Sequence, residues 1–208
     1  MLLVSFTGAQ STGKSTLLEL CKESLFPDPE WAAYGGHDSE CKWKFIPEVT
    51  RLIKRQYGVS INESGTDDTQ LLILNQHLIN TLTFKQQMYE DSSHYMMDRC
   101  IMDGLVYSRY LHNHGRLEDA TMAIAESMYQ RLLPSLDAIF YTHPEDIPIH
   151  DDGERSVDPG FRDEIIEIYD SLISSGYHGV GLNFHVLKGP PEDRLTTILK
   201  TLRELGGI

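Results

Sequence analysis

Cysteine is scarce in this sequence. Its 208 residues include three, Cys21, Cys41 and Cys100, and no two of them have C-x-x-C spacing. An odd number of widely spaced cysteines argues against a disulfide framework and against a structural zinc site. The pattern predicts free thiols in a reducing compartment, so we expect a cytoplasmic protein.

Long apolar runs are missing as well. No hydrophobic stretch approaches the length needed to span a membrane, and no basic region precedes the first apolar segment at residues 2–6. We therefore expect neither a transmembrane helix nor a signal peptide, and no membrane partner. The chain shows no internal repeat, linker or low-complexity tract, which predicts a single domain over residues 1–208.

The sequence has fewer basic residues than acidic ones. The chain has 18 lysines and arginines against 31 aspartates and glutamates, for a formal net charge of −13. A protein that binds nucleic acid irrespective of sequence normally presents a basic face, so this balance argues against such a role. It does not exclude a local basic cleft, and enzymes that handle phosphate can be acidic overall.

Residues 8–16 match the pattern G-x-x-x-x-G-K-[ST], between a strand-like and a helix-like segment. Its two glycines permit backbone angles that let successive N–H groups face phosphate oxygens, and the following helix adds its positive N-terminal end. Lys14 would reach the β- and γ-phosphates, and the Ser15 hydroxyl would ligate Mg²⁺. We therefore predict an ATP- and Mg²⁺-binding loop made of Gly8, Ala9, Gln10, Ser11, Thr12, Gly13, Lys14, Ser15 and Thr16.

Strand-like and helix-like segments alternate along the whole chain. We predict strands at 2–6, 41–47, 94–97, 138–141 and 183–187, and helices from about 14, at 49–57, 67–90, 104–113, 117–133, 161–174 and 191–205. This order predicts an α/β protein with a three-layer P-loop NTPase fold, in which helices cover both faces of a parallel sheet of about five strands. Residues 143–160 break all periodicity, and their prolines, glycines and charges predict a lid.

Charged residues that follow predicted strands are candidates for chemistry, because ligands bind at the carboxyl ends of parallel strands. Glu48 and Arg51 follow the second strand; the carboxylate could accept a proton from a substrate hydroxyl or hold it, and the arginine could bind a phosphate. A surface ion pair is the alternative interpretation. Asp98 ends the third strand beside Arg99, where phosphoryl-transfer enzymes place an acid that holds Mg²⁺. Asp103 is interpreted as a helix cap.

Two later segments complete the predicted site. Arg155 in the lid could neutralise charge on the transferring phosphoryl group, or belong to a solvated acidic loop. The turn at Gly189 and Pro190 follows the last strand and could lie against an adenine ring, or serve only to connect strand and helix.

The set of motifs resembles the P-loop kinase-like domain of the ribosylnicotinamide kinase type, and more distantly thymidylate and deoxynucleoside kinases. The resemblance is carried by the phosphate loop, Pro47-Glu48-Val49-Thr50-Arg51, Met97-Asp98-Arg99 with Asp103 and Tyr107, and Asp152-Gly153-Glu154-Arg155. It implies that Glu48 meets the substrate hydroxyl, that Asp98 and Arg99 meet metal and acceptor phosphate, and that Arg155 is a lid arginine. Cys100 replaces the aromatic residue of thymidylate kinases, so no thymidylate specificity follows.

Together these features predict an ATP- and Mg²⁺-dependent kinase acting on a nucleoside, a nucleotide or a related ribosyl compound. The predicted catalytic residues are Lys14, Glu48, Asp98, Arg99 and Arg155. Glu48, Arg51 and Arg99 are predicted to bind the acceptor, and Ser15 and Asp98 are predicted to bind the metal. Two alternatives stay open: a kinase for a hydroxymethylated base in DNA or for a polynucleotide end, and a regulatory nucleotide-binding ATPase. The D-x-x-G and N-K-x-D motifs typical of GTPases are absent. A homodimer is compatible with the sequence.

Overall fold

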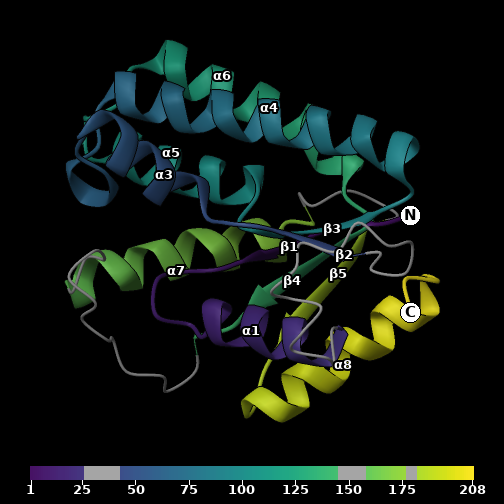
Figure 1. Cartoon of the computed structure of the whole chain (residues 1–208). Coiled ribbons are helices and arrows are strands. Elements are labelled where there is room, and N and C mark those ends of the chain that lie inside the picture. The colour runs from purple at the N-terminus through teal and green to yellow at the C-terminus, as the bar shows by residue number, and fades with distance from the viewer. Residues whose placement is uncertain (26–42, 145–157, 177–181) are drawn as a thin grey trace.

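A five-stranded parallel sheet forms the centre of the molecule (Figure 1). The structure is a computed structural model that describes residues 1–25, 43–144, 158–176 and 182–208. Its strands are β1 (Leu3–Thr7), β2 (Trp43–Ile46), β3 (His94–Asp98), β4 (Ala138–Thr142) and β5 (Asn183–Leu187), in the order β2-β3-β1-β4-β5. Because β1 is central, its end lies beside the ends of β3 and β4, with Phe6 opposite both Asp98 and Phe140.

Helices cover both faces of this sheet. The described residues form α1 (Lys14–Leu25), α3 (Val49–Tyr57), α4 (Asp67–Asp91), α5 (Ile101–Asn113), α6 (Asp119–Leu132), α7 (Pro159–Ser174) and α8 (Pro191–Glu204), with short 3₁₀ turns η1 (Asn62–Ser64) and η2 (Leu133–Ser135). Leu3 of β1 packs with α4, α5, α6 and α7, while Val4 and Phe6 pack with α1 and α8 on the opposite face. Successive strand side chains point to opposite faces, so one strand joins both cores.

The predicted α/β fold with a parallel sheet of five strands and helices on both faces is confirmed. None of the helices in the described parts of the chain is long and apolar enough to cross a membrane. Cys41 and residues 145–157 of the predicted lid lie outside the described residues. The last two residues of that lid, Pro159 and Gly160, instead begin α7, where Asp158 accepts a hydrogen bond from the Gly160 N–H and proline occupies the first turn.

One helix prediction was wrong in detail. Helix α5 begins at Ile101 and not at Gly104, because Asp103 caps it from inside its first turn. Helix α4 carries Leu71, Leu74, Leu78 and Leu82 at helical spacing, but these leucines do not define its buried face. Leu74 is buried, but Leu82 is exposed, and the side chains that α4 buries are Thr69, Gln70, Ile73, Leu74, His77, Thr81 and Met88.

Helix α3 is attached differently from the others. Its two buried side chains, Val49 and Ile53, form a small apolar cluster with Ile73 of α4. The two larger cores lie on the faces of the sheet and do not include α3 residues. Helix α3 therefore follows β2 at the sheet edge and rests on a limited apolar contact.

Candidate active site

The phosphate loop lies where β1 ends and α1 begins, so its backbone stands at a helix N-terminus. Gly8 has a φ of 141°, and a Cβ there would stand 2.6 Å from the Thr142 hydroxyl oxygen and 2.9 Å from the Thr142 carbonyl oxygen. No other residue fits this position, because both the backbone angle and the space exclude a side chain. Residues Ala9 to Thr12 are buried, so β4 and the loop pack closely.

Lys14 folds back over this loop. Its Nζ donates to the carbonyl oxygens of Gly8 and Ala9 at 2.8 and 2.5 Å and to the Thr12 hydroxyl at 3.3 Å. Burial, followed by the nearby charge of Arg99, lowers the pKa of Lys14 to about 7. Phosphate oxygens would offer this ammonium stronger, charged acceptors than the carbonyls it now contacts.

Arg99 joins the loop to the ends of two strands. Its Nε donates to Glu48 at 2.7 Å, and its Nη1 donates to Asp103 at 2.6 Å and to the Gly8 carbonyl at 3.2 Å. The φ of Arg99 is 80°, in the left-handed region that non-glycine residues rarely adopt. This strained backbone directs the buried guanidinium back toward the phosphate loop, and the two carboxylates hold it there.

Glu48 is the acid between two arginines. It accepts from Arg99 on one oxygen and from Arg51 Nε on the other at 2.9 Å. Burial alone would raise the pKa of its carboxyl, but the positive charges of Arg99, Lys14 and Arg51 outweigh burial and lower it. Glu48 is therefore a carboxylate at neutral pH. The predicted pair with Arg51 is present, and it belongs to a buried network that reaches the phosphate loop.

Asp103 anchors this network. Its side chain accepts from the Cys100 N–H, as a helix cap does, and also from the Thr7 hydroxyl at 2.8 Å and the Tyr169 hydroxyl at 2.7 Å. The interpretation of Asp103 as a cap is thus correct for α5 but incomplete. The same carboxylate ties Arg99, β1 and α7 together.

Ser15 and Asp98 line one side of a cleft of about 330 Å³ between α1 and α3, which also contains Glu48 and Arg51. Asp98 Oδ1 is buried and has no hydrogen-bond partner among the described residues. Burial and the charge of Glu48 raise the pKa of the Asp98 carboxyl. A buried carboxylate oxygen without a partner fits a cation ligand, and Mg²⁺ typically uses one or two protein oxygens plus substrate phosphates. The described residues hold no group of three His, Cys, Asp or Glu side chains that would form a protein-only metal site.

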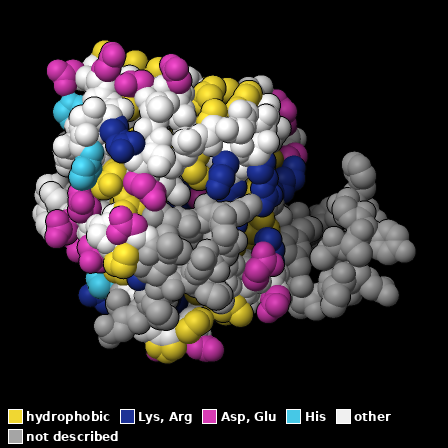
Figure 2. All heavy atoms as spheres, turned by 90° about the vertical axis from the view of Figure 1, so that its left-hand side faces the viewer, with side chains coloured by type: hydrophobic (Ala, Val, Ile, Leu, Met, Phe, Trp, Pro, Cys, Tyr) yellow, Lys and Arg dark blue, Asp and Glu magenta, His cyan; other side chains and the backbone are white. Residues whose placement is uncertain are grey.

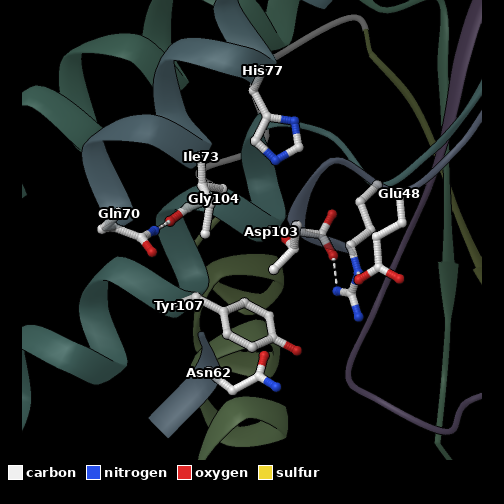
Figure 3. A pocket seen from close by; sticks show the side chains of 10 residues that line it. Glu48, Asn62, Gln70, Ile73, His77, Asp103, Gly104 and Tyr107 are labelled. Atoms are coloured by element: carbon white, nitrogen blue, oxygen red, sulfur yellow. Dashed lines mark hydrogen bonds and ion pairs between the residues drawn. The ribbon is translucent and has the colours of Figure 1, made fainter. Parts of the chain in front are cut away.

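A second, smaller cavity adjoins Glu48 on the side of α4 and α5 (Figure 3). Its volume is about 20 Å³, room for about one water molecule. Gln70 and His77 reach it from α4, and Asp103 and Tyr107 from α5. The ten lining residues are Glu48, Thr50, Asn62, Gln70, Ile73, His77, Arg99, Asp103, Gly104 and Tyr107.

The polar side chains that line this cavity differ in whether they have hydrogen-bond partners among the described residues. Gln70 donates to the Gly104 carbonyl at 2.9 Å and to the Ser108 hydroxyl at 2.8 Å. The Nε2 atom of His77 is buried and has no hydrogen-bond partner in the described part of the chain. Burial lowers the pKa of His77 to about 4, so the imidazole is neutral. A neutral, unpartnered ring nitrogen beside a cavity is available to a ligand.

Replacing His77 by Leu should stabilise the protein, because a buried polar atom without a partner would be removed. The unfolded chain takes up a proton on this histidine between pH 6.5 and about 4 and the folded chain does not, so the parent loses stability as pH falls through that range. We expect His77→Leu to gain about 1–3 kcal/mol at pH 7 in urea unfolding, and to gain more at pH 5. Replacement of the exposed His114 by Leu is the control. Equal acid sensitivity of parent and His77→Leu would contradict this assignment.

The turn at Gly189 and Pro190 lies on the opposite side of the phosphate loop. The Arg194 side chain links this turn to the loop. This side chain donates to the Gly189 carbonyl at 2.7 Å, to the Thr12 carbonyl at 3.1 Å and to the His143 carbonyl at 3.2 Å. The structure thus brings Gly189 to the same edge as the loop. Arg155 lies outside the described residues, so its assignment stays a prediction.

Sequence reasoning missed four residues of this region: Gln70, His77, Tyr169 and Arg194. Gln70 and His77 stand seven positions apart, so they share a face of α4, and that spacing was the available signal. The many leucines of the same helix made this polar pair hard to distinguish in the sequence. Tyr169 and Arg194 come from helices far along the chain and carry no local signal.

Comparison with protein families identifies the domain. The model of a family described as "AAA domain" matches residues 3–194. The chain belongs to this family. No curated protein matches the sequence.

Three solved structures share the fold of this AAA domain chain. Deoxyadenosine kinase from M. mycoides has a TM-score of 0.64 at 12% identity, covering 98% of this chain and 100% of its own. Thymidylate kinase from Candida albicans has a TM-score of 0.61 at 15% identity, covering 99% and 92%. The NadR protein in complex with NR has a TM-score of 0.63 at 15% identity, covering 100% of this chain and 51% of its own. The predicted P-loop kinase-like fold is therefore confirmed.

Proposed function

We propose that this chain is an ATP- and Mg²⁺-dependent kinase that phosphorylates a nucleoside, a nucleotide or a related ribosyl compound. One observation carries the proposal: the Glu48 carboxylate, held by Arg51 and Arg99, lines both the cleft beside the phosphate loop and the small cavity. A carboxylate in this position can hold an acceptor hydroxyl next to the donor phosphates. The fold shared with deoxyadenosine kinase, thymidylate kinase and NadR supports this reading.

The donor phosphates would lie on the loop from Gly8 to Thr16. There they would meet the backbone N–H groups, the start of α1 and the Lys14 ammonium. Ser15 and Asp98 would hold Mg²⁺, which when bound screens the charge of the phosphates. The turn at Gly189 and Pro190 would border the adenine ring.

In the transfer step, the acceptor hydroxyl oxygen attacks the γ-phosphorus and the bond to the β–γ bridging oxygen breaks, releasing ADP. Glu48 accepts the hydrogen bond of the hydroxyl and takes its proton as the new bond forms. Lys14 and Arg99 lie at the loop and balance the negative charge of the transferring group. Arg155 would add a further positive charge from the lid.

The acceptor ring would enter the cavity between Ile73 and Tyr107, where Gln70 and His77 offer polar contacts. At about 20 Å³ this cavity is far smaller than the 300 Å³ or more that a small-molecule site usually has, so α3 or η1 must move away from α4 for a nucleoside to bind. A free small molecule in the cytoplasm is the proposed acceptor.

One observation favours the alternative of an acceptor within DNA or at a polynucleotide end. Three of the chain's 18 basic residues, Lys22, Arg51 and Arg55, line the cleft beside Ser15, and Figure 2 shows lysine and arginine side chains gathered on this face. Such a cluster can contact a phosphate backbone. Glu19 lines the same cleft and pairs with Lys22 at 2.7 Å, which reduces its positive charge.

A screen with labelled ATP tests these readings. The purified chain and Mg²⁺ are incubated with nucleosides, nucleotides, ribosyl compounds and oligonucleotides with and without hydroxymethyl bases, and ADP release and label transfer are measured. We expect ADP release to rise on addition of a small-molecule acceptor that becomes labelled. Label in oligonucleotides alone would support the DNA alternative. Release that no acceptor changes would identify an ATPase.

A further inference from the structure

Arg194 is a buried cation close to the N-terminus of α8. Only 2% of its surface is exposed. A helix N-terminus carries partial positive charge, so a cation is electrostatically unfavourable there, and burial removes most of its hydration. Glu192 and Asp193 in the first turn of α8 offset part of this cost. Local helix stability therefore does not explain an arginine at this position.

The contacts of Arg194 join three segments that are far apart in the sequence. Its Nε donates to the Gly189 carbonyl at 2.7 Å, its Nη1 to the Thr12 carbonyl at 3.1 Å and its Nη2 to the His143 carbonyl at 3.2 Å. These carbonyls belong to the turn after β5, the phosphate loop and the residue that follows β4. Because the guanidinium is planar and its N–H groups have fixed directions, one side chain sets the relative positions of all three segments.

Thr12 extends this contact to the lysine of the phosphate loop. Its carbonyl accepts from Arg194, and its hydroxyl accepts from Lys14 Nζ at 3.3 Å. At the other end of the guanidinium, Gly189 has a φ of 83°, a left-handed conformation that favours glycine. Arg194 thus lies between the loop that would bind the phosphates of the donor and the turn that would border its base.

We propose that Arg194 is a positioning residue for the donor nucleotide. It holds the turn at Gly189 and Pro190 at a fixed distance from the phosphate loop, so that the base and the phosphates of one nucleotide bind at the same time. This assignment rests on the proposed function, which places the phosphates on the loop and the adenine ring at the turn. Arg194 acts through backbone carbonyls, and it orders the site before the ligand arrives.

The consequence is selectivity for ligands that carry a base. Without the three carbonyl contacts, the turn would have to become ordered when the nucleotide binds, and ordering even one backbone residue lowers affinity by about tenfold. The phosphate loop has further contacts of its own, because Gly8 lies against Thr142 and its N–H donates to the Tyr169 hydroxyl. A ligand made of phosphates alone should therefore bind equally well with or without Arg194.

Calorimetric titration of the full chain with ADP and with inorganic pyrophosphate, each in Mg²⁺, tests this proposal. Both ligands have two linked phosphates, and only ADP has a base and a ribose. The parent should bind ADP at least about 100-fold more tightly than pyrophosphate, because the base contacts the turn. In Arg194→Lys, which keeps the charge but not the planar fork, this ratio should fall at least about tenfold. The affinity for pyrophosphate should stay unchanged.

The control is Arg203→Lys, the same substitution at an exposed position in the last turn of α8, and it should keep the ratio of the parent. Arg194→Gln is a second variant with the same expectation as Arg194→Lys, because its shorter, uncharged amide cannot reach all three carbonyls. Circular dichroism verifies that each variant is folded.

An unchanged ratio in the folded Arg194 variants would overturn the proposal while leaving the proposed kinase intact. Equal losses of affinity for ADP and pyrophosphate would also overturn it, because a role in stability alone weakens both ligands alike. A parent that binds ADP no better than pyrophosphate would instead refute the placement of adenine at the turn, and the role of Arg194 with it.

Discussion

Replacing Lys14 by Ala is expected to lower phosphoryl transfer by at least about 10²–10³-fold, the loss typical of removing one donor that stabilises transition-state charge. The Nζ lies on the phosphate loop, within 2.8 Å of the Gly8 carbonyl, so the variant removes positive charge from the place where the γ-phosphate would sit. Transfer is measured from labelled ATP to the acceptor that the screen identifies.

The fold should survive this substitution. Burial disfavours the charged form of Lys14, so its removal relieves desolvation, and the melting temperature should stay constant or rise. Lys200→Ala is the matched control, since it removes the same charge from an exposed position on α8 that lines neither the cleft nor the small cavity. Undiminished transfer by Lys14→Ala would refute the assignment of the loop as the donor site.

Glu48→Gln is expected to lower transfer by about 10²–10⁴-fold, the usual contribution of a positioned acid or base. The amide keeps the shape of the side chain but loses the negative charge that holds Arg51 and Arg99 at 2.9 and 2.7 Å. It also cannot take the proton of the acceptor hydroxyl. The rate constant should therefore fall whatever the Mg²⁺ concentration.

The Asp98→Asn variant distinguishes the proposed role of Glu48 as a base from the proposed role of Asp98 as a metal ligand. If Asp98 holds Mg²⁺, its variant should need more Mg²⁺ for half-maximal rate, and excess Mg²⁺ should restore part of the activity. Assays across a Mg²⁺ series for both variants distinguish the two carboxylates. Recovery of Glu48→Gln at high Mg²⁺ would show that Glu48 acts through the metal and is not the base.

The sequence predicted the sheet well because its strands are short apolar runs bounded by clear turn residues. For the same reason, the residues that follow the strands could be placed together at the carboxyl-end edge of the sheet. These residues are Glu48, Asp98 and Arg99. Glycine and lysine spacing located the phosphate loop at the start of α1. These features depend on local pattern and on the rule that parallel strands end together.

The acceptor side could not be predicted in the same way. Helix α4 has leucine or isoleucine on several faces, and only packing against α5 and α6 decides that Gln70 and His77 turn inward while Ile79 and Leu82 turn outward. The role of Asp103 depends on the left-handed backbone of Arg99, which nothing in the adjacent sequence signals.

The small apolar contact beneath α3 has an energetic consequence. Burial of Val49 and Ile53 stabilises the closed position of α3 by roughly 3–6 kcal/mol, at about 1.5–3 kcal/mol for each side chain. Local opening of α3 is therefore much easier than unfolding of either core, and it widens the cavity that Glu48 and Thr50 border. An acceptor that binds the open form loses this free energy from its affinity, about tenfold for each 1.4 kcal/mol. The apolar side chains buried under one short helix would thus limit how tightly the proposed kinase can hold its acceptor.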